Sequence, residues 1–339
     1  MNTNVGTEAI TKSDIKNVEK ALLSYNSNPY FEKYKKAELE QYTEFTSKKD
    51  IVLSKCFTLP KENPQIPFDY SNDILLNLIE EENQAFANQT NYFVFQKDIN
   101  EDMRFILYEW LFRLQIKYKF QCDTIHIAFN LIERFLMSTT TFILKSQYQI
   151  LGLSCLLIAC KYQEIYFPNV VDFVNMTDNS VTIEELLFFE MTVLTELKYQ
   201  VTMPLLTTLI ELLSLKIKFS DNMLKKALFL ADVVVLDYEI VNKNNLVDIA
   251  FAICFLVLHK YQKDSITKLV KFYESIIIKD LIGDEDEVAN QSKIIYYKLE
   301  YLMEKIYFFN LQNNGYNCNN KLMVLYQNKY GANSEYIFY

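Results

Sequence analysis

The sequence contains very little glycine and proline. Its 339 residues include only five glycines and six prolines. Gly152 is the only glycine between Gly6 and Gly283, and only two prolines follow Pro67. Because these two residue types most often interrupt helices, their scarcity indicates long helices joined by short turns. The lack of a glycine-rich phosphate loop also argues against an ATPase, a kinase or a dinucleotide-dependent enzyme.

Positive charge is scarce as well. The formal net charge is −9, so the sequence lacks the broad basic footprint of proteins that bind nucleic acid or anionic membranes. The longest runs without a charged residue, such as Ser146–Cys160, are shorter than the roughly 20 apolar residues of a spanning helix. The first residues lack the apolar core of a secretion signal. We therefore expect neither a transmembrane segment nor secretion.

Cysteine and histidine are few and scattered. None of the six cysteines forms a CxxC pair, and several lie in apolar helical runs where cysteine acts as a small hydrophobe. The two histidines, His126 and His259, are far apart in sequence, and we see no cysteine or acidic ligand pattern beside either. We predict a reduced intracellular protein without a disulfide, a metal site or a cofactor, in which neither histidine is catalytic.

Hydrophobic periodicity predicts helices along most of the chain. The expected helices cover residues 73–86, 100–118, 123–137, 146–162, 182–198, 205–216, 222–238, 246–261 and 265–279. Thr182 and Glu185 form a capping box at the start of one of them. The β-branched runs Val233–Val235 and Ile276–Ile278 leave short strands open as an alternative.

The second half of the sequence looks like a weaker copy of the first. The nearly all-apolar segment Leu246–Leu258 follows the similar segment Ile150–Ala159 by about 100 residues. A helix that is apolar on every face is expected at the centre of a bundle. We therefore predict two helical bundles in tandem: a tail over 1–70, bundles over 71–203 and 204–310, and a tail over 311–339.

One carboxylate lies in the middle of an apolar helical stripe. Glu190 shares its helix face with Leu186, Leu187 and Val193. A buried, ionised glutamate costs several kcal/mol unless it is paired. Either the helix is rotated so that Glu190 reaches solvent at a rim, or it pairs with a cation. Lys161, which closes the apolar 146–160 helix, is the candidate cation.

Four sequence runs resemble, in order, the conserved box of the cyclin family. They are FQKDINEDMRFILYEWL (95–111), TIHIAFNLIERFL (124–136), LGLSCLLIACKYQEIYFP (151–168) and DFVNMTDNSVT (172–182). The resemblance spans residues 91–204, continues more weakly to 302, and is closest to the mitotic A/B-type cyclins. It implies an all-α fold of two tandem five-helix cyclin-fold domains, with a lead-in helix and flexible tails.

The resemblance also implies a role. Such a chain is not an enzyme; it binds and activates a cyclin-dependent serine/threonine kinase in the cell cycle, with G2/M as the expected stage. Lys161 and Glu190 match the signature pair of the kinase interface, and we place Glu164 beside them. Arg104 matches an arginine that we expect to be structural. The alternative is a divergent or transcription-associated cyclin-fold protein that binds a partner without activating a kinase.

A substrate-docking groove is a second site that the resemblance implies. Its apolar residues match one stripe of the 100–118 helix, and an ordinary core face is the other interpretation of that stripe. Arg113 stands where many A-type members carry an acid, and Tyr148 where a leucine is common, which changes the rim of the groove. The expected groove residues are Met103, Ile106, Leu107, Trp110 and Gln149.

The same resemblance implies a short degradation signal in the N-terminal tail. Lys61, Glu62 and Asn63 match the KEN sequence that the ubiquitin ligase of mitotic exit reads. The expected partners are therefore a cyclin-dependent kinase, protein substrates at the groove and ubiquitin-ligase machinery at the tail, without nucleic acid or membrane. The expected localisation is the nucleus and the cytoplasm.

Overall fold

The structure, a computed structural model, describes residues 70–87, 89–139, 142–178, 180–261, 265–277 and 301. All regular elements in these ranges are helices, which confirms the expected all-α fold. None of these helices is long and apolar enough to cross a membrane. The predicted tails, including Lys61, Glu62 and Asn63, lie outside the described residues apart from Tyr70.

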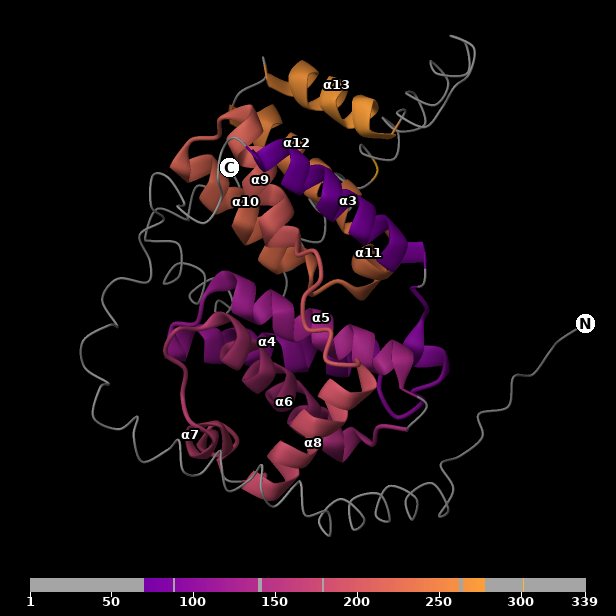
Figure 1. The fold of residues 1–339 in the computed structure, drawn as a ribbon, viewed down its shortest axis with the longest axis vertical. Helices are drawn as coiled ribbons and strands as arrows, with labels where there is room; N and C mark the ends of the chain where they lie inside the picture. The colour runs from indigo at the N-terminus through magenta and orange to yellow at the C-terminus, as the bar shows by residue number, and fades with distance from the viewer. Residues whose placement is uncertain are drawn as a thin grey trace, which may run out of the picture.

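The first set of helices surrounds α6. It consists of α4 (Glu101–Tyr118), α5 (Cys122–Ser138), α6 (Lys145–Gln163), the short α7 (Val170–Asn175) and α8 (Ile183–Glu196). Every residue of α6 from Ile150 to Cys160 is buried, and the other four helices pack around it. Figure 1 shows this group in the lower half of the molecule. The apolar 146–162 segment is therefore the central helix that its composition predicts.

The second set surrounds α12. It consists of α9 (Leu206–Ile217), α10 (Asp221–Val234), α11 (Tyr238–Lys243), α12 (Leu246–Tyr261) and α13 (Ile266–Ile277). The helix α3 (Ser71–Ala87) precedes the first set in sequence, but it packs on α9 and α12, as Figure 1 shows. The proposed division of the chain between residues 203 and 204 stays a prediction.

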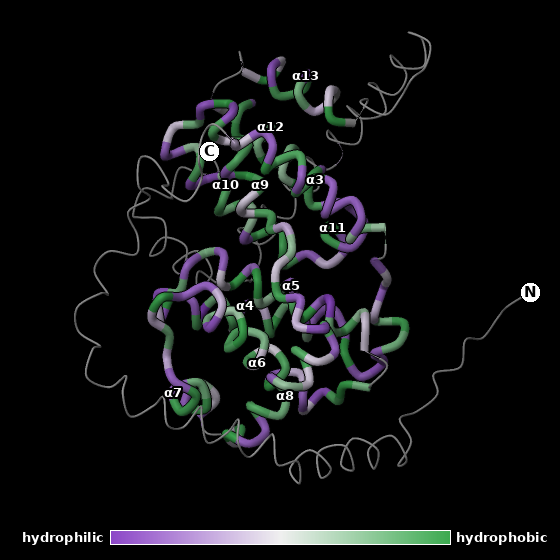
Figure 2. The backbone as a smooth tube through the Cα atoms, viewed as in Figure 1, coloured by the Kyte–Doolittle hydropathy of each residue, from purple (hydrophilic) through white to green (hydrophobic). Residues whose placement is uncertain are grey.

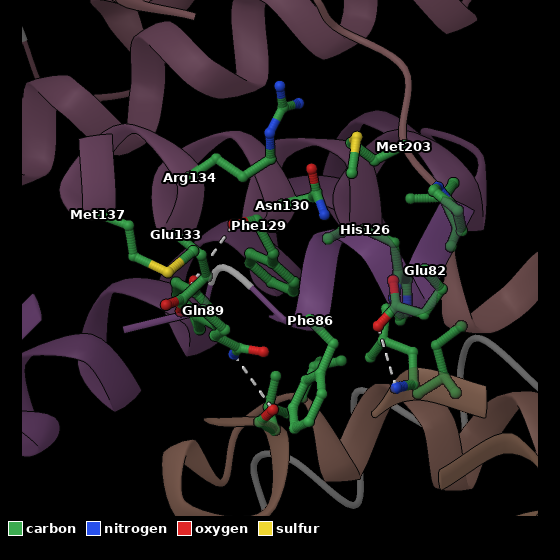
Figure 3. A pocket seen from close by; sticks show the side chains of 18 of the residues that line it. Glu82, Phe86, Gln89, His126, Phe129, Asn130, Glu133, Arg134, Met137 and Met203 are labelled. Carbon is green, nitrogen blue, oxygen red and sulfur yellow. Dashed lines mark hydrogen bonds between the residues drawn. The ribbon is translucent and has the colours of Figure 1, made fainter. Parts of the chain in front are cut away.

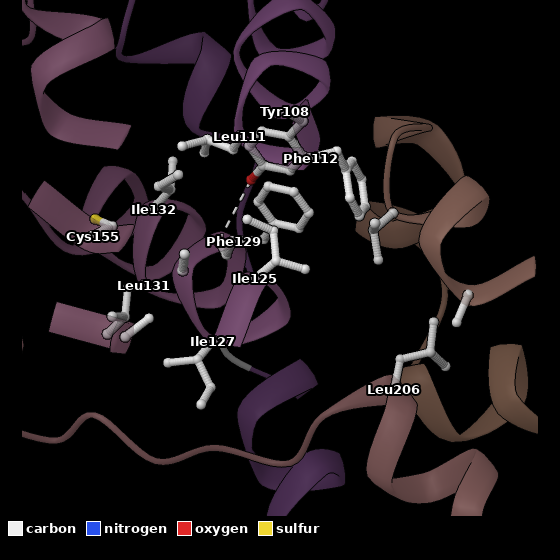
Figure 4. Close-up of a cluster of buried hydrophobic side chains, with 14 of the residues drawn as sticks. Tyr108, Leu111, Phe112, Ile125, Ile127, Phe129, Leu131, Ile132, Cys155 and Leu206 are labelled. Carbon is white, nitrogen blue, oxygen red and sulfur yellow. Dashed lines mark hydrogen bonds between the residues drawn. The ribbon is translucent and has the colours of Figure 1, made fainter. Parts of the chain in front are cut away.

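Aromatic side chains hold α4 against α5. The rings of Tyr108 and Phe129 are stacked with centroids 4.0 Å apart, and Phe112 meets Phe129 edge to face. Figure 4 shows these rings beside Ile125 and Ile132. In Figure 2, hydrophobic stretches run through the central α6, whereas α3 alternates between hydrophobic and hydrophilic residues, as expected of a helix with one buried face.

Polar side chains cap the starts of helices, and residues with positive φ stand at helix ends where glycine is usual. The Asn100 side chain accepts a hydrogen bond from the Met103 N–H at 2.9 Å, and Thr182 with Glu185 forms the predicted capping box. At the other ends of α4 and α9, Lys119 and Lys218 adopt φ of 58° and 61°. Most chains place glycine at such positions. The short turns therefore do not depend on glycine.

Three details of the helix prediction are wrong. The expected single helix over 222–238 is broken, because α10 ends at Val234 and α11 begins at Tyr238. The strand alternative at Val233–Val235 is also wrong, since Val233 and Val234 close α10. Likewise, Ile276 and Ile277 are helical in α13. The six-residue α7 and the 3-10 turn Tyr92–Val94 were not predicted, because each is too short to show a period.

Candidate partner-binding surface

Lys161 and Glu190 form the ion pair that helical spacing suggested. Nζ of Lys161 lies 2.8 Å from Oε1 of Glu190, which joins the last turn of α6 to the middle of α8. The Glu190 side chain is 2% exposed and the Lys161 side chain 20%. The alternative in which Glu190 reaches solvent at a rim is therefore wrong. The pairing is confirmed, while its role in binding stays a prediction.

The pair sits where removal of either partner has a high cost. Leu186, Leu187 and Val193 are fully buried around Glu190, so the carboxylate has lost its water. Breaking a buried pair by removing one member costs about 3–5 kcal/mol, because the other charge stays desolvated. The exposed fifth of Lys161 marks where the pair meets the surface.

Exposed apolar side chains follow this lysine directly. Tyr162, Ile165 and Tyr166 are 52%, 79% and 51% exposed, at the end of α6 and in the loop toward α7. We name these three side chains the 162–166 patch. Contiguous exposed apolar groups often mark a protein-binding surface. Sequence reasoning missed the patch as a site; its signal was an Ile-Tyr-Phe run in a polar turn before Pro168.

Glu164 faces a different helix. Its Oε1 accepts hydrogen bonds from the Gln121 N–H at 2.7 Å and the Thr124 hydroxyl at 2.5 Å. Burial raises the pKa of Glu164, and these two hydrogen bonds act against that rise. Glu164 thus caps the first turn of α5 and fixes the start of the loop that carries the 162–166 patch. Its predicted contact with a kinase stays a prediction.

The predicted groove residues divide between surface and core. Ile106 is 63% exposed, Met103 and Trp110 are half-buried, and Gln149 is exposed on α6. Leu107 is buried instead and lies against Gly152 of α6. Arg113 pairs with Glu109 one turn away on α4. The stripe is therefore partly exposed, as a groove requires, and partly an ordinary core face. The groove as a binding site stays a prediction.

A cavity of about 120 Å³ lies between the two helix sets. In Figure 3, Glu82, Phe86 and Gln89 lie on the side of the cavity near α11 and α12. Side chains of α5, which include His126 and Asn130, line the opposite side. Oε1 of Glu82 accepts a hydrogen bond from the Leu246 N–H at 3.1 Å. Burial, aided by the charge of Asp248, raises the pKa of Glu82 to about 7, although the Leu246 hydrogen bond opposes the rise.

Arg104 connects the two sets beside this cavity, in keeping with its expected structural role. Its Nη1 and Nη2 donate to the carbonyls of Leu236 and Val235 at 3.0 and 2.9 Å, and its Nε lies 2.6 Å from Oε1 of Glu133. The carbonyls of the turn after α10 are thus satisfied by a side chain of α4. This contact explains why one predicted helix became two.

His126 is buried in the core, but an aspartate and a cysteine lie close to it, although we saw no such ligand pattern in the sequence. Its Nε2 lies 2.9 Å from Oδ1 of Asp232 in α10, and the Cys122 thiol lies 3.5 Å from the same oxygen. Sequence offered half of this signal, because Cys122 and His126 are four residues apart on one helix face. Asp232 was not foreseeable, since it lies 106 residues further along the chain.

The model of the cyclin N-terminal domain matches residues 73–202, which include the whole Lys161–Glu190 site. Residues 73–202 are therefore assigned to the cyclin N-terminal domain family.

The relatives are A- and B-type cyclins. Over 143 residues the chain is 37% identical to Cyclin-A1-2 of Oryza sativa subsp. japonica, covering 42% of this chain and 30% of that protein. Over 181 residues it is 31% identical to the G2/mitotic-specific cyclin-B2 of Mesocricetus auratus, covering 53% of this chain and 45% of that one. The match therefore spans less than half of each of these two relatives. The predicted mitotic A/B type is confirmed.

A solved structure shares the fold. The X-ray structure of a viral cyclin from herpesvirus saimiri aligns with a TM-score of 0.51 at 14% identity, covering 70% of this chain and 97% of the viral one. At this identity the likeness concerns the fold alone, and it confirms the cyclin fold over most of the described helices.

Proposed function

We propose that this chain is the regulatory subunit of a cyclin-dependent serine/threonine kinase and activates it in cell-cycle control, at G2/M. The observation that carries the proposal is the Lys161–Glu190 pair at the edge of the core, directly followed by the exposed 162–166 patch. Names of the A- and B-type relatives support the same role. The groove around Trp110, the Lys61–Asn63 signal and the nuclear and cytoplasmic localisation are proposed from the family resemblance alone.

The patch and the ion pair would contribute to binding in different ways. Apolar side chains that are more than half exposed gain roughly 25 cal/mol for each Å² that a partner covers. The ion pair supplies directional contacts, which a partner desolvates further on binding. Activation requires the chain to bind the active kinase conformation more tightly than the inactive one, because only this difference shifts the population.

The first test is a substitution on the patch. Ile165→Asp places a charge on a side chain that is 79% exposed, so the fold is kept while apolar contact with a partner is lost. We expect affinity for a purified cyclin-dependent kinase to fall by about 2 kcal/mol or more, as for a central interface residue. The measurement is titration calorimetry against a panel of such kinases, together with histone phosphorylation by the mixtures.

Val94→Asp is the matched control. Val94 is also an exposed aliphatic residue, 63% exposed, but it lies before α4 and away from the patch in sequence. It should bind and activate as wild type does. If no kinase of the panel binds, or if Ile165→Asp and Lys161→Ala both bind and activate normally, the proposed interface is wrong. Binding without activation would instead identify a scaffold with a cyclin fold.

A further inference from the structure

Cys122, His126 and Asp232 bring three metal-ligand atoms together between the helix sets. Cys122 begins α5, His126 lies one turn later on the same face, and Asp232 lies near the end of α10. The thiol sulfur, an imidazole nitrogen and a carboxylate oxygen all lie within 4.8 Å of one another. Within the part of the chain that the structure describes, no other group of this kind occurs.

Two of the three residues in this cluster are buried. Asp232 is fully buried and His126 is 4% exposed, whereas Cys122 is half-buried. A buried carboxylate is stable only when positive charge or several donors compensate it. Here a single oxygen of Asp232 faces both the imidazole Nε2 and the thiol. One divalent cation would take the place of the protons held between these three atoms.

We propose that Cys122, His126 and Asp232 form a zinc site that joins α5 to α10. Two ligands four residues apart on one helix face is a spacing that zinc proteins use. With metal–ligand bonds of about 2.0–2.3 Å, tetrahedral ligand atoms lie roughly 3.4 Å apart. The observed separation of 3.5 Å between the Cys122 sulfur and Asp232 Oδ1 agrees with that value, whereas the 2.9 Å between His126 Nε2 and Asp232 Oδ1 is a hydrogen-bond distance that must widen when a metal binds.

The choice of zinc follows from the ligand chemistry. A thiolate and an imidazole nitrogen suit zinc and are poor ligands for magnesium or calcium. Binding removes the thiol proton of Cys122 and any proton on the Nε2 of His126. The charges of Zn²⁺, one thiolate and one carboxylate then sum to zero, which lowers the cost of burial. Water takes the fourth position on the side of Cys122, where the cluster meets solvent.

Zinc content and cobalt spectroscopy test the site on the purified full-length chain. We expect one equivalent of zinc to remain after desalting, and Co²⁺ exchanged into the protein to show a thiolate-to-cobalt charge-transfer band in the near ultraviolet. Cys122→Ala should remove this band and lower zinc affinity at least about 10-fold, because a direct ligand matters no less than its neighbours. Zinc should also raise the Tm of wild type and leave that of Cys122→Ala unchanged.

Cys254→Ala is the control for other thiols, because Cys254 is buried inside α12. It should keep the band and the affinity of wild type. Circular dichroism without metal checks that Cys122→Ala folds, as expected for a half-buried position. A wild-type chain that binds neither zinc nor cobalt would show that the cluster is a metal-free hydrogen-bonded group. A band or affinity unchanged in Cys122→Ala would place the metal elsewhere, and either result overturns the proposal. Kinase binding is not needed for any of these measurements.

Discussion

At the scale of single residues, Glu82 couples folding to pH. Its carboxyl accepts the Leu246 N–H, and burial raises its pKa from 4.5 to about 7. Between these values the folded chain holds a proton that the unfolded chain releases. The stability contributed by Glu82 is therefore present below pH 4.5 and is lost as the pH rises through 7.

Glu82→Gln should remove this dependence, because glutamine keeps the acceptor oxygen without the charge. As the pH rises from 4.5 to 7, the unfolding free energy of the variant should increase by about 3 kcal/mol relative to that of wild type. Urea unfolding at several pH values measures the difference.

Glu81→Gln is the control, since Glu81 is exposed on the same helix. Its difference from wild type should stay nearly constant with pH. If the Glu82→Gln difference is equally flat, Glu82 is charged in the folded chain and the assignment fails.

The sequence predicts contacts between residues when both lie in strongly patterned helices. Lys161 and Glu190 were paired because each stands out as a charge on an apolar helix. Helical spacing also places Cys122 beside His126, but the third member of that cluster comes from another helix set. The inward turn of Glu164 toward α5 was likewise not visible, because a single glutamate in a loop carries no periodic signal.

At the scale of helices, Gly152 sets how closely α4 approaches α6. A Cβ atom at Gly152 would lie 2.8 Å from Cδ1 of Leu107, which is itself buried. Gly152→Ala gains up to about 1 kcal/mol in helix propensity but loses roughly 1–3 kcal/mol through overpacking. We expect a net loss of about 1 kcal/mol in unfolding free energy, measured by urea unfolding.

The Leu107→Ala background reverses that sign. Without the leucine methyl groups the overpacking disappears, so Gly152→Ala should then stabilise the chain by up to about 1 kcal/mol. An equal loss in both backgrounds would mean that the contact with Leu107 does not limit the helix approach.

Helix prediction succeeded where the helix is apolar and continuous. The bounds of α12 match the expected 246–261, and every residue from Val247 to Phe255 is buried. The break between α10 and α11 was missed for a physical reason. Residues 222–238 have a helical pattern throughout, and the carbonyls of the turn are taken by Arg104 of α4, which no local pattern reports.

At the scale of the whole molecule, Arg104 is one of the buried connections between the two helix sets, beside the contact of His126 with Asp232. Burial alone would lower its pKa, but the charge of Glu133 keeps it above the ordinary value, so the guanidinium is charged. Arg104→Met would remove the cation beside Glu133, which keeps the Tyr108 hydroxyl as a donor, and would take the Arg104 donor from the carbonyls of Val235 and Leu236. We expect a loss of about 3–5 kcal/mol and a calorimetric trace that separates into two transitions, because the helix sets then unfold less cooperatively.

Arg113→Met provides the comparison. Its guanidinium is 45% exposed and bonds only within α4, so its loss should change stability by less than about 0.5 kcal/mol. A single, unshifted transition in Arg104→Met would show that the helix sets are held together by other contacts.

The two apolar segments were foreseeable as the central helices α6 and α12, but the place of α3 was not. The segment 71–87 precedes the first set in the chain, and its amphipathic pattern reports only that one face is buried. The pattern does not say which helices cover that face. The contacts of α3 with α9 and α12 depend on which surface of the second helix set is left uncovered by its own helices.

The position of α3 has a consequence for the order in which the protein is made. Glu82 bonds to Leu246, 164 residues later in the chain. A ribosome that adds roughly 5–20 residues per second therefore produces Glu82 on the order of ten to thirty seconds before Leu246 of α12 is made. The first set, whose helices are close neighbours in sequence, is complete by then. During translation the newly made chain thus carries α3 without the helices that cover it, until α9 and then α12 have been made.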